Sequence, residues 1–230
     1  MSSFGRELRL AARTLLRKPG FSTVSILTIA LAIAACTLVY SLVHRVLLQP
    51  LPYPAADRLV QVWQVSRDGG RQGQFSYPNF EDLRDGSRAF AALAQYVSGT
   101  GTVLVGNNPL RAQVATVSAG FFDVFRTASR RGRLFADEDR HPGSAPVAVV
   151  SHGFWQRAMA GADPASVSIR IGDRPHAVVG VMPPQFAFPE GVEIWTPREQ
   201  HARNPHRTGH NWRVVGQLAD GTPSPRRART

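Results

Sequence analysis

Residues 21–43 form a long apolar run, FSTVSILTIALAIAACTLVYSLV, that contains no Asp, Glu, Lys or Arg. A helix of this length rises about 1.5 Å per residue and spans about 34 Å, enough to cross a bilayer core of roughly 30 Å. Its polar side chains are small or carry a hydroxyl group, and a membrane helix can hold them against its own backbone or a neighbouring helix. The pattern predicts a transmembrane helix, and we assign residues 21–48 to the membrane segment.

A lipoprotein signal is the alternative for this stretch. Ile33-Ala34-Ala35-Cys36 is similar to a lipoprotein processing box, in which Cys36 would carry the lipid. The apolar run continues to Val43, however, whereas a released lipoprotein normally turns polar after its cysteine, and the apolar region of a cleaved signal peptide is shorter, about 7–15 residues. These features favour a membrane span in which Cys36 is a small packing residue.

The charged residues beside the span predict its orientation. Only His44 and Arg45 follow the span closely, whereas five basic residues precede it: Arg6, Arg9, Arg13, Arg17 and Lys18. Positive charge marks the cytoplasmic side, so the N-terminus is expected in the cytoplasm and residues from about 49 onward outside it. The spacing of the arginines also predicts an amphipathic basic helix within residues 1–20, lying in the cytoplasmic interface. The alternative is a flank that only sets the topology.

The remaining chain alternates between strand and helix patterns. Alternation or continuous apolar runs predict strands at 59–65, 103–105, 112–117 and 145–150, and a hairpin of 168–171 with 176–181. Capping signals predict helices from Ser76 to Arg84, within 118–125, and from His152 to Met159 after Ser151. Phe186, Phe188, Ile194 and Trp195 are expected to close the core. The pattern predicts a mixed α+β domain over 49–216, and residues 217–230 form a polar Pro/Arg-rich tail expected to be disordered.

Composition narrows the classes of partner. The chain has a formal net charge of +11, yet Lys18 is its only lysine and the arginines are scattered rather than clustered with aromatic residues. This distribution argues against nucleic acid as a partner. The single cysteine excludes an intrachain disulfide, so apolar packing must hold the outer domain together.

The search for reactive motifs predicts no catalytic, cofactor-binding or metal-binding residues, and hence no enzyme. The only lysine precedes Pro19 and cannot complete a P-loop, and neither His-Glu-x-x-His nor Gly-x-Ser-x-Gly occurs. His201, His206 and His210 could offer imidazoles to zinc, but Arg203 and Arg207 lie between them and disfavour a cation. We interpret Asp137-Glu138-Asp139 as a solvated acidic turn rather than a cation site.

The order of several short segments resembles one family. These segments are Arg13-Thr-Leu-Leu-Arg-Lys-Pro-Gly-Phe21, Pro50-Leu-Pro-Tyr-Pro, Ser76-Tyr-Pro-Asn-Phe, Phe121-Phe-Asp-Val-Phe, Gly132-Arg-x-Phe135, Val149-Val-Ser-His-Gly-Phe-Trp155, Val178-Val-Gly-Val-Met-Pro183 and Trp195. Together they resemble the N-terminal part of an ABC transporter permease of the MacB/FtsX-like class, with its MacB-like periplasmic core domain. Single segments are weak signals, but their order is specific.

The resemblance implies a permease subunit of an ABC-type export system in a bacterial inner membrane, with a periplasmic main domain. It also implies a separate ABC ATPase subunit, a homodimer and three further membrane helices. The family's ATPase-contacting residues have no counterpart here, because a polar tail follows residue 218. We therefore expect a truncated or frame-shifted product. The alternative is a single-pass or lipid-anchored extracytoplasmic binding module without a transport role.

Overall fold

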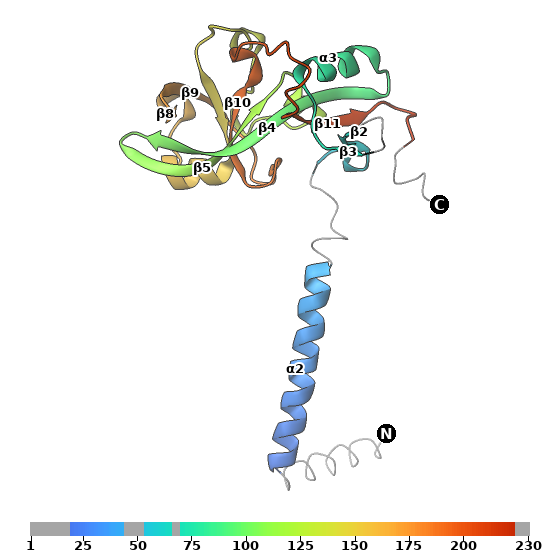
Figure 1. The fold of residues 1–230 in the computed structure, drawn as a ribbon. Coiled ribbons are helices and arrows are strands. Elements are labelled where there is room, and N and C mark those ends of the chain that lie inside the picture. The colour runs from blue at the N-terminus through green and yellow to red at the C-terminus, as the bar shows by residue number, and fades with distance from the viewer. Residues whose placement is uncertain (1–18, 44–52, 66–69, 224–230) are drawn as a thin grey trace. The chain divides into compact units, whose positions relative to one another are not determined.

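A computed structural model describes residues 19–43, 53–65 and 70–223 (Figure 1). The chain divides after Leu51 into two compact units, and each is described by itself. The basic helix expected within residues 1–20 lies outside the described residues, except for Pro19 and Gly20. The last part of the expected membrane segment, residues 44–48, also lies outside them.

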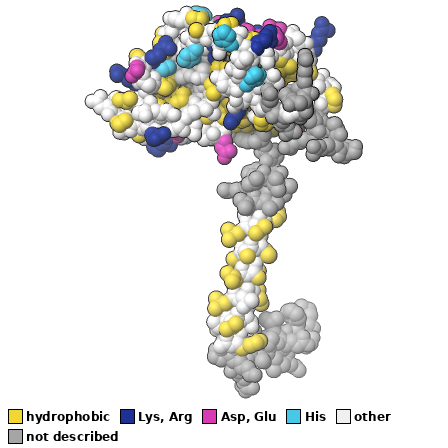
Figure 2. Space-filling view, viewed as in Figure 1, with side chains coloured by type: hydrophobic (Ala, Val, Ile, Leu, Met, Phe, Trp, Pro, Cys, Tyr) yellow, Lys and Arg dark blue, Asp and Glu magenta, His cyan; other side chains and the backbone are white. Residues whose placement is uncertain are grey.

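The apolar run forms one helix, α2 (Pro19–Val43). Pro19 and Gly20 are its first residues, a position where proline lacks only an amide that would have no partner. The hydroxyl groups of Thr28 and Thr37 donate to the carbonyl oxygens four residues earlier, at 2.8 and 2.7 Å. The large apolar side chains are exposed along the helix (Figure 2). Its 22 residues Gly20–Ser41 are long and apolar enough for a candidate membrane span.

The second unit is an α+β domain built on a nine-stranded mixed sheet. The strands of this sheet are β1 (Leu59–Val62), β4 (Phe90–Val105), β5 (Asn108–Val117), β6 (Arg131–Gly132), β7 (Val147–Val150), β8 (Ser168–Ile171), β9 (Arg174–Val181), β10 (Val192–Pro197) and β11 (Arg213–Leu218). A small separate ribbon pairs β2 (Gln64–Val65) with β3 (Arg71–Gln72). The helices are α3 (Tyr77–Gly86), α4 (Phe121–Val124) and α5 (His152–Met159), with short 3-10 turns η2 (Ala56–Arg58), η3 (Asp137–Asp139), η4 (Pro164–Ser166) and η5 (Arg198–Gln200).

The strand order along the sheet is β1-β11-β4-β5-β10-β7-β9-β6. β10 runs parallel to β5 and β7 runs parallel to β9, whereas the other pairs are antiparallel. β8 pairs with both β4 and β9, so the path from β4 through β5, β10, β7, β9 and β8 returns to β4. This closed path of strands surrounds one apolar cluster that includes Val103, Val150, Ile169 and Ile194.

Two further clusters complete the core. The larger is rich in aromatic residues from α4, from the segment before β10 and from β10 itself, including Phe121, Phe122, Phe125, Phe186 and Trp195. Neighbouring rings meet at angles typical of edge-to-face packing, such as 87° between Phe125 and Phe186 at 5.4 Å. The smaller cluster lies under α3 and contains Phe75, Phe80, Leu93, Trp212 and Val214. Burial of Phe186 and Trp195 confirms their expected place in the core.

Several predicted elements are present with altered ends. The hairpin of β8 with β9 and the buried strand β7 are confirmed. Ser151 caps α5 by accepting a hydrogen bond from the Phe154 amide at 3.1 Å. The expected strand at 59–65 is interrupted at Trp63, where β1 leaves the large sheet and β2 begins the small ribbon.

The sequence pattern predicts only the last three residues, 103–105, of the strand β4. β4 is 16 residues long, about 50 Å at 3.3 Å per residue. Its centre contains Gly99 and Gly101, and glycine is depleted in strands, so the local pattern does not predict one. Hydrogen bonding to β5, β8 and β11 stabilises the strand despite its weak local propensity.

The strands β10 and β11 were also not predicted. β11 lies between β1 and β4, so residues from the two ends of the domain sequence are neighbours in the sheet (Figure 1). It runs two residues past the expected domain end at 216, and both Gln217 and Leu218 are buried.

Candidate functional site

Two of the short sequence segments meet backbone to backbone where β6 crosses β9. Gly132 pairs with Gly180 in the antiparallel register. A Cβ atom on Gly132 would lie 2.2 Å from the Val179 carbonyl oxygen, and one on Gly180 would lie 2.1 Å from the Arg133 carbonyl oxygen. Gly132 also has a positive φ of 65°, which favours glycine. Glycine is therefore needed at both positions, because the backbones of the two segments approach too closely to leave room for a side chain.

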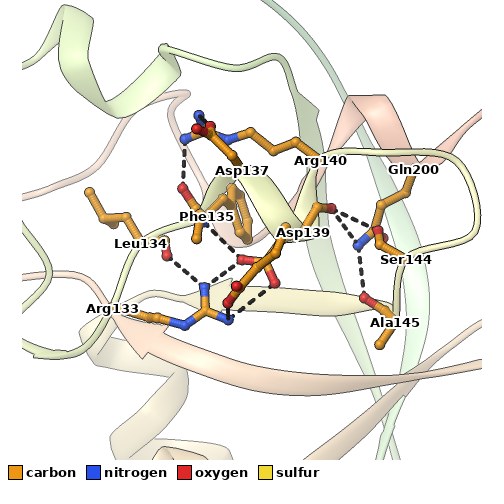
Figure 3. Close-up of polar contacts among 11 residues, drawn as sticks. Arg133, Leu134, Phe135, Asp137, Asp139, Arg140, Ser144, Ala145 and Gln200 are labelled. Carbon is orange, nitrogen blue, oxygen red and sulfur yellow. Dashed lines mark hydrogen bonds and ion pairs between the residues drawn. The ribbon is translucent and has the colours of Figure 1, made fainter.

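The acidic turn follows directly from this crossing (Figure 3). The buried carboxylate of Asp139 accepts hydrogen bonds from the Ala136 amide, at 2.8 Å, and from both terminal nitrogens of Arg133. Burial alone would raise the pKa of Asp139, but the Arg133 and Ala136 hydrogen bonds outweigh it, so the pKa lies below the ordinary value of 3.8. Only Asp137 and Glu138 of the turn are exposed.

Further hydrogen bonds tie the same turn to the rest of the domain. Gln200 of η5 donates from one amide nitrogen to the carbonyl oxygens of Asp139 and Ala145, each at 3.0 Å. Ser144 donates to the Asp139 carbonyl at 2.9 Å. Arg140 donates to the Phe135 carbonyl at 2.6 Å and pairs with Asp137 at 3.2 Å. The expectation of a wholly solvated turn is wrong for Asp139, because its carboxylate holds the turn together from inside.

The Ser76-Tyr-Pro-Asn-Phe segment starts α3 and contacts the loop after η5. Ser76 accepts a hydrogen bond from the Asn79 amide at 3.3 Å, which caps the helix. Tyr77 lies against the guanidinium group of Arg198, 4.2 Å from the ring centre, and Arg198 also lies 5.5 Å from the Trp212 ring centre. Arg198 is only 3% exposed. It donates to the carbonyl oxygens of His201 and Ala202, so cation–π contacts and carbonyl groups compensate its burial.

Ion pairs attach the rest of this loop to α3. Arg203 pairs with Glu81 at 2.9 Å and lies over the Tyr77 ring, while Arg207 pairs with Asp82 at 2.6 Å. Arg207 also donates to the Asn79 side-chain oxygen at 2.8 Å. The arginines between the histidines therefore have a structural use, which is to hold residues 201–211 against α3.

The three histidines considered as zinc ligands lie on this exposed loop. Over residues 19–43, 53–65 and 70–223, no group of three or more His, Cys, Asp or Glu side chains is placed to hold a metal ion. Partial burial lowers the pKa of His201, and the nearby Arg174 and Arg198 lower it further. Sequence inspection missed the buried His176, whose pKa is lowered mainly by burial. Its strand pattern offered no signal beyond alternation.

Basic and acidic side chains are interspersed over the visible face of the domain (Figure 2). Several charged side chains of the described residues form ion pairs, for example Arg157 with Glu193 at 2.6 Å. Most arginines of the described residues therefore form ion pairs, contact aromatic rings or donate hydrogen bonds to carbonyl groups.

Comparison with known proteins agrees with this architecture. The family model for the MacB-like periplasmic core domain matches residues 22–226. Macrolide export ATP-binding/permease protein MacB of Neisseria gonorrhoeae is 30% identical over 110 residues, and the same protein of Neisseria meningitidis serogroup B is equally similar. Each match covers 46% of this chain and 17% of the relative, so the chain corresponds to a small part of those proteins.

Solved structures show the same fold at low sequence identity. The periplasmic region of MacB from Actinobacillus actinomycetemcomitans aligns with a TM-score of 0.57 at 17% identity, covering 74% of this chain and 79% of that one. The extracellular domain of the noncanonic ABC-type transporter YknZ from Gram-positive bacteria aligns with a TM-score of 0.53 at 16% identity, covering 71% and 84%.

The described residues define the class: a helix long and apolar enough to span a membrane is followed along the chain by a mixed α+β domain that shares its fold with the periplasmic region of MacB. Within that class, the chain belongs to the family of the MacB-like periplasmic core domain.

Proposed function

We propose that this chain serves as part of the permease subunit of an ABC-type export system, anchored by α2 and presenting its α+β domain outside the cytoplasm. The observation that carries the proposal is the combination of an exposed, charge-free helix with a domain of this family. The family relationship supports a partner ABC ATPase and a homodimer.

We propose further that the domain acts mechanically or by handling cargo rather than by bond chemistry. β4 is continuous over about 50 Å and is hydrogen-bonded to β11, β5 and β8. A strand paired in this way resists bending because neighbouring strands share any deformation. This supports a domain that moves as one body and transmits displacement between its ends.

Topology is the property that tests this proposal most directly. Asn107 lies in the exposed turn between β4 and β5, and Cys36 is the single cysteine. In a Cys36→Ala, Asn107→Cys variant, we expect a membrane-impermeant maleimide to label intact spheroplasts. Labelling only after lysis would overturn the orientation, which rests on the arginine and lysine excess before the span.

The Cys36→Ala change alone separates a membrane anchor from a lipoprotein. If α2 is a span, the variant keeps the wild-type mass and membrane retention, because the other apolar residues still drive insertion. If Cys36 is lipidated instead, the wild type loses residues 1–35 and gains acyl chains, while the variant remains a larger precursor. Intact mass spectrometry distinguishes the two, and we expect no mass difference beyond the substitution itself.

A further inference from the structure

An open groove lies at the β1 edge of the sheet. It has a volume of about 780 Å³ and is lined by Gln61, Trp63, Gly73, Gln74, His210 and Arg213. These six residues come from three separate segments of the chain, 61–63, 73–74 and 210–213. None of them is acidic.

The strand register explains why these segments meet. Val62 of β1 pairs with Val214 of β11, which brings Trp63 next to Arg213 at the end of the ladder. Phe75 and Trp212 form an isolated bridge, with N–H···O distances of 2.6 and 3.1 Å. This bridge brings Gln74 and His210, which lie one and two residues before its members, to the same groove.

Trp63 forms an aromatic wall of the groove. A Cβ atom on Gly73 would lie 2.6 Å from the Trp63 ring, so the ring rests against the backbone at a position where only glycine leaves room. Trp63 is nevertheless 44% exposed, whereas Trp155, Trp195 and Trp212 are buried. The ring is thus supported on one side by the protein and partly open to solvent.

Arg213 gives the described lining of the groove a positive charge. Arg213 forms no ion pair with a carboxylate of the described residues, unlike Arg203 and Arg207 nearby. Its guanidinium group interacts with the hydroxyl group of Tyr96 on the neighbouring strand, which anchors it without neutralising it. Gln61 and Gln74 add amide donors and acceptors at the rim.

We propose that this groove binds a small organic anion that carries a planar ring. The ring would stack on Trp63 and the anionic group, a carboxylate or sulfonate, would bind Arg213. Trp63 and Arg213 line the same groove, so one molecule could place its ring on Trp63 and its anionic group on Arg213. This binding site is independent of the transport role proposed above.

Three probes of one ring system test the proposal on the full chain in nanodiscs of zwitterionic lipid. They are 2-naphthoate, its neutral alcohol 2-naphthalenemethanol and the cationic 2-(aminomethyl)naphthalene, titrated calorimetrically with empty nanodiscs subtracted. We expect 2-naphthoate to bind, the alcohol to bind about tenfold more weakly, and the amine to show no binding, because one charge-assisted hydrogen bond contributes about this factor.

Matched variants assign the binding to the groove. Arg213→Gln should weaken 2-naphthoate about tenfold, and Trp63→Ala should weaken all probes that bind. Arg111→Gln, at an exposed arginine on β5 outside the groove, should change nothing. Near-ultraviolet circular dichroism checks that each variant is folded. Equal affinity for the three probes, no binding of 2-naphthoate, or equal effects of the two arginine changes would each overturn the proposal.

Discussion

At the residue scale, the strongest constraint is the contact between Gly132 and Gly180. The carbonyl groups of Val179 and Arg133 occupy the positions that side chains would need. Gly99 on β4 differs, because a Cβ atom added there would have no neighbour within 4 Å. The same residue type is therefore required at one place and replaceable at another, and only the fold distinguishes the two.

Gly180→Ala should destabilise the domain by about 1–3 kcal/mol, because β6 must move away from β9 to admit a methyl group. Gly99→Ala is the control and should be neutral or slightly stabilising, since alanine in a strand restricts the unfolded chain. Urea unfolding of the full chain, followed by tryptophan fluorescence, measures both. Equal midpoints for the two variants would contradict the close approach.

Asp139 gives a second residue-scale prediction, with a dependence on pH. Because its pKa is lowered from 3.8 in the folded state, its contribution to stability is present above pH 3.8 and is lost as pH falls through the folded pKa. Asp139→Asn should cost about 1–3 kcal/mol at neutral pH, since the Ala136 amide and Arg133 lose a charged acceptor.

The control for Asp139 is Asp137→Asn, which removes a fully exposed carboxylate of the same turn. Its surface ion pair with Arg140 should contribute little, about 0–1 kcal/mol. Urea unfolding at several pH values should show the difference between wild type and Asp139→Asn narrowing on acidification. A constant difference down to the lowest pH would show that the carboxylate charge is not responsible.

At the scale of elements, α3 and the loop 201–211 hold each other in place. Arg198 is central, because it is buried in contact with the rings of Tyr77 and Trp212 and also donates to two loop carbonyl groups. Arg203 contacts the same Tyr77 ring but is largely exposed. The two arginines thus offer a matched pair, one buried and one at the surface.

Arg198→Lys should destabilise the domain by about 1–3 kcal/mol, because an ammonium group cannot reproduce the planar stacking and the two carbonyl bonds. We expect a red shift of tryptophan emission, because loosening the loop exposes Trp212. Arg203→Lys keeps the charge opposite Glu81 and should shift neither stability nor emission by a measurable amount. Indistinguishable behaviour of the two variants would refute the central position of Arg198.

At the scale of the whole molecule, β11 joins the beginning of the domain to its middle, because it pairs with β1 on one side and β4 on the other. Its final residues Gln217 and Leu218 are buried, and Asp220 forms an ion pair with Arg58. We therefore expect stable folding of the domain to require residues beyond 216.

Two truncated chains test this boundary. The chain 1–223 keeps all of β11 and the Arg58–Asp220 pair, and we expect wild-type stability for the domain. The chain 1–216 lacks Leu218 and should lose about 2–5 kcal/mol, the usual cost of removing a large buried apolar side chain. Urea unfolding and protease resistance measure both. Equal stability of the two chains would place the domain end at 216 after all.

The sequence by itself determined the features that short segments encode. The long charge-free apolar run at 21–43 specifies a helix, alternation predicts the β8–β9 hairpin, and Ser76 and Ser151 mark helix starts, because each depends on neighbours a few residues away. The order of the motif segments was also enough to indicate the family, which the match over residues 22–226 confirms.

Only the tertiary structure decided which residues meet across long separations. β4 and β11 lack strong local signals and exist as strands because they pair with each other and with partners far away in the sequence. The pairing of Gly132 with Gly180, the burial of Asp139 and Arg198, and the groove at Trp63 and Arg213 likewise bring together residues that are far apart in the sequence. Hydrophobic periodicity reports which face of a segment is buried, but the partner of that face is set by packing of the whole chain.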